Sequence, residues 1–142
     1  MPAFRTSVLV LLAVAAAGLS VACTPSQARV PAAGEKVQVT ERDFQITAPK
    51  SVSSGDLVLH VKNEGPEWHE LIVVHRGKRL PLRTDGMTVN EEALAGAIAG
   101  ILEPAAAGVR DLRLHLAPGH YQFFCNMAGH FMAGMSGDIV VR

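Results

Sequence analysis

The sequence has few cysteines and no excess of either charge, and each shortage excludes a class of protein. Its two cysteines stand at positions 23 and 125, too few for the disulfide framework of a small secreted domain. Lysine plus arginine number 13, and aspartate plus glutamate also number 13. Without a basic excess the chain has no field that attracts nucleic acid, which argues against a nucleic-acid-binding role. The 142 residues are enough for one domain and hardly for two.

Apolar runs long enough to span a membrane are also lacking. The apolar run 8–17 follows the single positive charge of Arg5 and leads into small residues that end at Cys23. This layout is typical of a secretory signal, and its apolar part is too short for an ordinary membrane span. We therefore predict a signal peptide over 1–22 and an extracytoplasmic location.

The residues at the end of this signal indicate that Cys23 is a site of lipid attachment. Residues 19–23 read LSVAC, which resembles a bacterial lipoprotein signal, in which the cysteine is lipidated and becomes the new N-terminus. The alternative is cleavage after Ala22 or Ala28, which leaves a soluble exported protein. Because Cys23 lies at the signal, we predict no disulfide with Cys125. Residues 23–35 are small, polar and proline-containing and predict a flexible spacer.

The region 36–142 contains short alternating runs separated by turn residues, and we treat it as one domain. Apolar residues at every second position share one face in several of these runs, among them Leu57, Leu59 and Val61, then Leu112, Leu114 and Leu116, and finally Tyr121, Phe123 and Cys125. Short strands with regular turn signals predict an all-β sandwich.

One segment, 76–108, interrupts this pattern and is too long for a simple loop. Thr88 and Glu91 fit a capping box, apolar residues then recur at helical spacing, and Pro104 ends the run. The spacing predicts an inserted helix over 89–102, with its apolar stripe packed on the sandwich rather than offered to a partner.

The stretch 119–137 carries a candidate metal site. Cys125, His130 and Met135 are each separated from the next by four residues, and His69 stands at the head of an earlier apolar run. Thiolate and thioether favour Cu(I), while imidazole binds either oxidation state, so copper suits this set best. Taken singly, Cys125 and Met135 could equally be buried core residues. The other histidines are expected on the surface or, for His75, near the opposite end of its strand: His60, His75, His115 and His120.

These residues together resemble the cupredoxins, the small blue copper proteins. The likeness rests on three short motifs: Pro118-Gly119-x-Tyr121-x-Phe123-x-Cys125, Ala128-Gly129-His130 and Gly134-Met135-x-Gly137. It implies a Greek-key β-sandwich with one copper ion, held in plane by His69, Cys125 and His130 and axially by Met135. The chain departs from the family at Glu70, where many members have asparagine or a similar small polar residue that ties the two ligand loops together. A carboxylate there would either lower the potential or face solvent. Met132, a second thioether near His130, is the alternative axial ligand.

The resemblance implies an electron carrier without catalytic residues. Electrons would leave through His130, and weak contacts with redox proteins would form on an apolar patch around it, made of Met127, Ala128, Phe131, Met132 and Ala133. We expect a monomer that meets the membrane only through its N-terminal lipid. A copper chaperone or scavenger is the alternative, supported by the extra methionines. A copper enzyme is a third reading, but it needs a second copper with more histidines, and the remaining four do not cluster in sequence.

Overall fold

The computed structural model describes residues 34–77 and 79–142, and almost all of its regular structure is β. Three predicted features lie outside the described residues: the signal peptide, Cys23 and most of the spacer. The strands in the described part are β1 (Glu35–Arg42), β2 (Gln45–Thr47), β3 (Ser51–Val52), β4 (Gly55–Asn63), β5 (His69–His75), β6 (Ile98–Ala105), β7 (Gly108–Leu116), β8 (Gly119–Phe124) and β9 (Ser136–Val141). One short 3-10 helix, η1 (Glu92–Leu94), precedes β6.

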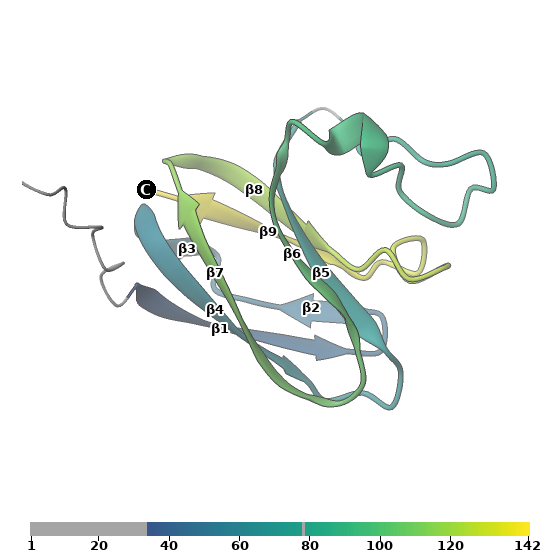
Figure 1. Cartoon of the computed structure of the whole chain (residues 1–142), viewed down its shortest axis with the longest axis horizontal. Helices are drawn as coiled ribbons and strands as arrows, with labels where there is room; N and C mark the ends of the chain where they lie inside the picture. Colours follow the sequence, from purple (N-terminus) through teal and green to yellow (C-terminus); the bar gives the residue numbers. More distant parts are fainter. Residues whose placement is uncertain (1–33, 78) are drawn as a thin grey trace, which may run out of the picture.

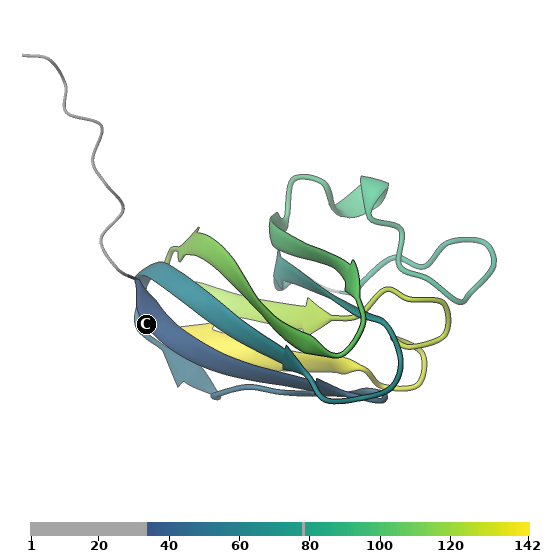
Figure 2. The same ribbon diagram turned by 60° about the horizontal axis from the view of Figure 1, so that its bottom comes forward.

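Two mixed sheets face each other (Figures 1 and 2). The first has the order β2-β1-β4-β7, and the second has the order β3-β9-β8-β5-β6. The pairs β1–β4 and β3–β9 are parallel, and the other pairs are antiparallel. The all-β sandwich expected from the sequence is confirmed.

The core fills the space between the sheets. Alternate residues of β1, β4 and β8 point inward, so Val39, Leu59 and Phe123 are fully or almost fully buried. Strand β5 is buried on both faces except at His75. Its Leu71 and Val73 face the main core, whereas Ile72 and Val74 form a second apolar cluster with Val89 and Phe124.

The helix predicted over 89–102 is wrong. Within that range the chain forms only η1 and then enters β6, which pairs with β5 along an antiparallel register. Alternation and helical spacing both fit the apolar residues of this segment, and the otherwise unpaired edge of β5 decides between them. Glycine at 100 allows β6 to lie close to β7, because a Cβ there would be 3.1 Å from Leu114 Cδ2 and 3.3 Å from Leu112 Cδ2.

The expected capping box does not form either. Glu91 precedes η1 but makes no side-chain cap, and its carboxylate instead accepts a hydrogen bond from Asn126. The expected packing role of the segment is nevertheless seen. Val89 is fully buried, and Leu80, Leu82 and Leu94 pack against the outer face of β5 and β8.

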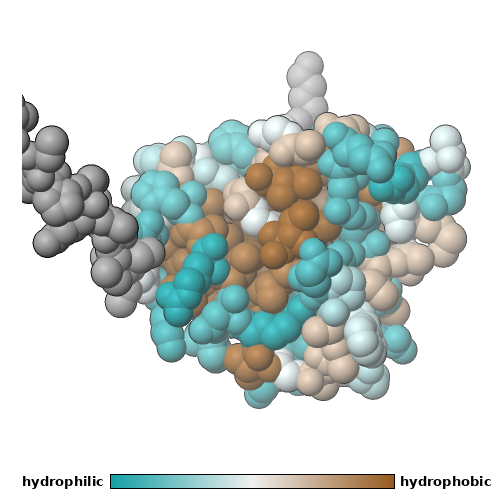
Figure 3. Space-filling model, in the orientation of Figure 1, coloured by the Kyte–Doolittle hydropathy of each residue, from teal (hydrophilic) through white to brown (hydrophobic). Residues whose placement is uncertain are grey.

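The same end of the molecule carries this segment and the 125–135 loop, whereas Gly34 and the C-terminus lie at the opposite end (Figures 1 and 2). On the face seen in Figure 1, apolar side chains gather between β6 and β7, the adjacent edge strands of the two sheets (Figure 3). Leu102, Leu112 and Leu114 are only partly buried there. Among the described residues, no helix has the length and apolar character needed to cross a bilayer.

Candidate metal centre

Three predicted donor residues converge at the end of the sandwich that carries the 125–135 loop. His69 begins β5, Cys125 directly follows β8, and His130 lies five residues further on. The Nδ1 atoms of His69 and His130 are 3.3 Å apart, and Cys125 Sγ lies 3.5 Å from His130 Nδ1. One donor atom from each residue falls within 4.8 Å of the other two. His69 and Cys125 are fully buried, and His130 is half-buried.

Strand pairing and a tight loop produce this convergence. Strands β5 and β8 are antiparallel neighbours with Ile72 opposite Phe124, so the start of one meets the end of the other. In the loop, Cys125 N–H donates to the Met135 carbonyl at 3.1 Å, and Met135 N–H donates to the His130 carbonyl at 3.0 Å. Gly129 and Gly134 have φ values of 83° and 99°, a region that residues with a Cβ rarely adopt. The loop therefore aims two donors from one short segment.

The sulfur of Cys125 lies in an apolar setting. Burial raises the pKa of its thiol, and the backbone N–H groups of Glu70 and Met127, which hydrogen-bond the sulfur, partly oppose this rise. A thiol in such surroundings is not a free nucleophile, whereas a coordinated cation deprotonates it outright. Two N–H donors also fix the sulfur in place.

Asp43 holds the His69 ring at Nε2, the nitrogen that faces away from His130. Asp43 Oδ1 lies 3.2 Å from His69 Nε2, which leaves Nδ1 directed at His130 and the site. Burial lowers the pKa of the His69 imidazole, and the hydrogen bond to Asp43 opposes that effect. The neutral form, which binds metals, is therefore favoured. Sequence reasoning missed Asp43, because an aspartate between two strands reads as an ordinary turn residue.

A buried ion pair lies behind His69 and was also missed. Arg110 Nη2 donates to the His69 carbonyl at 3.2 Å and lies 3.3 Å from Glu41 Oε2. Glu41 is fully buried, and this burial raises the pKa of its carboxyl. The nearby charge of Arg110 opposes the rise only in part. A signal existed in the sequence: Glu41 shares the inward face of its run with Val37 and Val39.

Met135 and Met132 differ sharply in burial. Met135 is fully buried in the cluster that contains Cys125, whereas Met132 is 55% exposed. A buried thioether beside the cysteine can reach a metal held there, and a solvent-facing one is poorly placed to do so. This contrast favours Met135 over Met132 as an axial donor.

Solved structures that superpose on this chain include auracyanins and rusticyanins. Auracyanin from Roseiflexus castenholzii superposes with a TM-score of 0.59 at 19% identity, over 75% of this chain and 96% of that one. Rusticyanin from Thiobacillus ferrooxidans gives 0.57 at 16% identity, over 77% and 79% of the two chains. The chain has the cupredoxin fold. Auracyanin A from Chloroflexus aurantiacus, described as a "blue" copper protein, gives 0.56 at 15% identity over 77% and 99%. No sequence-family model and no curated protein matches the chain, so the cupredoxin likeness rests on structure.

Glu70 joins the two segments that carry the candidate donors. Glu70 is only 9% exposed, so the alternative in which its carboxylate faces solvent is wrong. Its backbone N–H reaches the Cys125 sulfur, and its carboxylate accepts a hydrogen bond from the Asn126 backbone. Burial, followed by the charge of Glu91, raises the pKa of Glu70 to about 7. A carboxyl group thus ties the segments that carry His69 and Cys125.

The apolar patch predicted around His130 is partly solvent-facing. Ala128, Met132 and Ala133 are exposed, whereas Met127 and Phe131 are half-buried. Phe131 instead packs edge-on against Phe124, with ring centroids 5.7 Å apart. Three more exposed apolar residues lie near this patch: Phe44, which contacts His130, Met87, whose carbonyl accepts from Gly129 N–H, and Trp68, which precedes His69.

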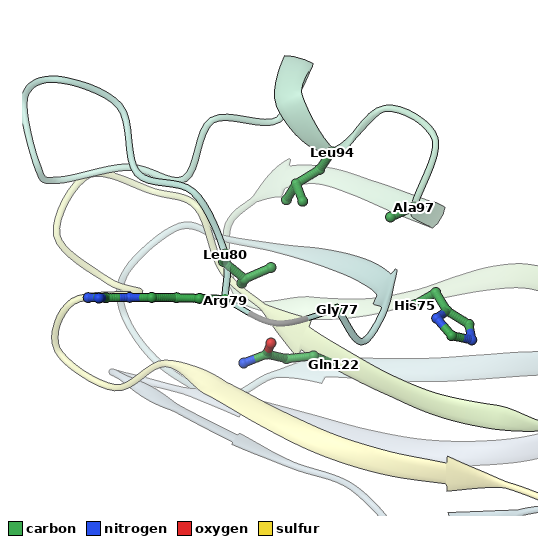
Figure 4. Close-up of a pocket in the computed structure, with 7 residues that line it drawn as sticks. All are labelled: His75, Gly77, Arg79, Leu80, Leu94, Ala97 and Gln122. Carbon is green, nitrogen blue, oxygen red and sulfur yellow. The ribbon is translucent and has the colours of Figure 1, made fainter.

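The remaining histidines lie away from the centre. His60 and His115 pair with Asp111 and Asp56 on the first sheet, at 2.7 and 2.8 Å. His75 lies at the far end of β5 against Tyr121, with ring centroids 5.1 Å apart. It borders a cavity of about 60 Å³ beneath the 76–97 segment, where its ring and the Arg79 side chain point in opposite directions (Figure 4). In residues 34–77 and 79–142, only the His69, Cys125 and His130 group has metal-binding spacing.

Proposed function

We propose that this chain is an exported type 1 copper protein that carries single electrons between redox partners. The observation that carries the proposal is the convergence of His69, Cys125 and His130, with donor atoms within 4.8 Å of one another in a largely buried centre. Two imidazoles and one thiolate with a weak axial thioether form the donor set of blue-copper electron-transfer sites. These three residues would hold the ion, and the buried thioether of Met135 would be the weaker fourth donor.

The chain's own residues suit electron transfer. When bound, copper supplies a one-electron couple between Cu(II) and Cu(I). His69 is fixed by a strand, Asp43 and Arg110, while Cys125 is fixed by two backbone N–H groups. A donor set held so firmly changes little between oxidation states, which keeps the reorganisation energy small. Its burial leaves little room for a substrate at the metal, which favours a carrier over an enzyme.

His130 is the proposed point of electron exit. It is half-buried, and the exposed residues Ala128, Met132 and Ala133 surround it in the loop. Apolar, uncharged surface of this kind suits brief contacts with a redox protein, because weak encounters need little buried area. The proposal that the protein is exported, and tethered through Cys23, rests on the sequence of 1–23.

A copper chaperone remains the second candidate, and one observation favours it. The side chains of Met87 and Met132 are about half exposed, at 50% and 55%, at the end that carries the centre. Exposed thioethers can capture Cu(I) from solution or from another protein. A chaperone hands its copper to an acceptor, whereas a carrier retains it through both oxidation states.

The absorption and electron paramagnetic resonance spectra of the full chain loaded with Cu(II) test the proposal, beside Cys125→Ser. We expect an intense thiolate-to-copper band in the visible range and a narrow copper hyperfine splitting, both absent from the variant. A colourless wild-type protein, or a band that survives in Cys125→Ser, would contradict the assignment of Cys125.

A further inference from the structure

The two-residue turn between β1 and β2 contacts both histidines of the metal centre. Asp43 Oδ1 lies 3.2 Å from His69 Nε2, and the Phe44 ring meets the His130 ring edge-on, with centroids 5.1 Å apart and an interplanar angle of 85°. Arg42 pairs with Gln45, so Asp43 and Phe44 alone form the turn. The turn therefore touches the centre at both of its imidazoles.

We propose that Asp43 is a positioning residue for the copper centre: its carboxylate fixes His69 as the Nε2–H tautomer, directs Nδ1 at the metal and lowers the reduction potential. The inference rests on the copper site proposed above. Sequence reasoning gave Asp43 no role, and its contact with His69 spans 26 residues of chain.

Because His69 is buried, its contact with Asp43 decides which ring nitrogen carries the proton. The imidazole is fully buried, so its N–H needs an acceptor inside the protein. The Asp43 carboxylate is an acceptor only, and Nε2 is the ring nitrogen that it meets. The proton therefore resides on Nε2, and the lone pair of Nδ1 is left for the metal. Carboxylates that orient metal-binding histidines in this way also raise the basicity of the ring.

Charge gives the second effect. Asp43 is 32% exposed and lies beside a fully buried imidazole, so its negative charge is only partly screened from the centre. A nearby negative charge stabilises Cu(II) more than Cu(I). The reduction potential should therefore be lower with aspartate than with a neutral residue of the same shape.

Gly65 keeps the carboxylate in this position. A Cβ on Gly65 would clash with Asp43 Oδ1, the oxygen that meets His69. Such a clash cannot persist, and the Asp43 side chain is the partner that can move. An alanine at 65 therefore displaces the carboxylate from His69 while Asp43 itself is unchanged.

The backbone of the turn is unusual in the same place. Phe44 has φ of 63°, and it is the one non-glycine residue of the described chain with positive φ. Two-residue hairpin turns normally place glycine or asparagine where such an angle is required. A bulky residue kept there against its backbone preference suggests that its contact with His130 is needed. Together, Asp43 and Phe44 make this turn part of the centre.

Four variants of the full chain separate the effects. Asp43→Asn keeps an acceptor of the same shape without charge, and Asp43→Ala removes the acceptor. Gly65→Ala displaces the carboxylate. Asp111→Asn is the matched control, because Asp111 bonds surface His60 at 2.7 Å in the same way, away from the centre.

Nitrogen-15 NMR of the copper-free chain at pH 8 reads the His69 tautomer. We expect Nε2–H in wild type, Asp43→Asn and Asp111→Asn, and a mixed or reversed tautomer in Asp43→Ala and Gly65→Ala. With copper bound, the reduction potential should rise in Asp43→Asn and stay at the wild-type value in Asp111→Asn. Cu(II) affinity should fall about 10- to 100-fold in Asp43→Ala.

An Nδ1–H tautomer in wild type, or an unchanged tautomer in Asp43→Ala, overturns the positioning role. A potential in Asp43→Asn equal to that of wild type overturns the effect of charge. A wild-type chain that takes up no copper overturns the proposed function, and this inference with it. The three failures are therefore distinguishable.

Discussion

The side chain of Asn126 pairs with the backbone of Val89 as a neighbouring strand would. Val89 N–H donates to Asn126 Oδ1 at 2.5 Å, and Asn126 Nδ2 donates to the Val89 carbonyl at 3.0 Å. Asn126 directly follows Cys125, and Val89 lies in the segment that covers the outer face of β5. One amide therefore ties the covering segment to the 125–135 loop.

Asn126→Ala should destabilise the copper-free protein by about 2 to 4 kcal/mol. The change leaves the backbone N–H and carbonyl of the fully buried Val89 without hydrogen-bond partners. Chemical denaturation measures the loss. Asn90→Ala is the control, since the Asn90 side chain makes only an exposed 3.3 Å bond in the same segment and should cost under about 1 kcal/mol. If the two variants lose the same free energy of unfolding, the hydrogen bonds between Asn126 and Val89 do not stabilise the fold as expected.

Glu70→Gln should change how stability depends on pH. Burial raises the pKa of Glu70 from 4.5 to about 7 in the folded chain. The stability that it contributes is thus fully present below pH 4.5 and is lost as pH rises through 7. Removing the charge should leave stability unchanged at pH 4 and increase it at pH 8 by up to about 3 kcal/mol, at 1.36 kcal/mol per pKa unit.

Urea denaturation of the copper-free wild type and variant at both pH values measures this difference, in which other titrating groups cancel. Glu92→Gln serves as the control, because that side chain is 79% exposed and should show no pH-dependent difference. A Glu70→Gln protein whose advantage is the same at pH 4 and pH 8 would contradict the burial of an ionisable carboxyl.

Met135→Leu should alter the copper centre, and Met132→Leu should not. Met135 is fully buried beside Cys125, whereas Met132 is 55% exposed. Both changes conserve volume, so each should cost less than about 1.5 kcal/mol of stability. The visible spectrum and reduction potential should shift only in Met135→Leu. If Met132→Leu alone shifts them, the axial assignment is wrong.

Ala133→Glu should slow electron self-exchange between oxidised and reduced copies by about tenfold or more at low salt, since like charges would meet at the exit patch. Ala133 is exposed in the 125–135 loop, whereas Phe131 is half-buried and a charge there would also damage packing. Ala117→Glu carries the same charge on the exposed β7–β8 turn and should leave the rate near wild type. NMR line broadening gives both rates. If both variants slow self-exchange to a similar extent, the surface around His130 is not the contact surface.

Local sequence patterns sufficed for the strands and for the donor residues closest in sequence. Alternation in 57–61 and 112–116 marks inward faces directly, because side chains in a strand alternate between its two sides. The spacing of Cys125, His130 and Met135 lies within one loop, so its geometry depends little on the rest of the chain.

Contacts made by tertiary packing could not be found in this way. Segment 98–105 fits a helical pattern as well as an alternating one, and only its pairing with β5 makes it a strand. Asp43 reaches His69 only because the turn after β1 folds against the start of β5, and nothing in the local sequence distinguishes it from other turn aspartates. Arg110 and Glu41 were different, since both occupy inward positions in alternating runs and could have been recognised as a buried pair.

The measurement that tests the central claim most directly is redox cycling of the copper-loaded full chain in the presence of a Cu(I)-specific chelator. The blue absorption band should disappear on reduction with ascorbate and return in full on reoxidation, over repeated cycles, with no copper in the chelator. That result means the chain retains copper through both oxidation states, as an electron carrier must. A band that fails to return, with copper found in the chelator, would contradict the electron-carrier function and favour a protein that delivers Cu(I).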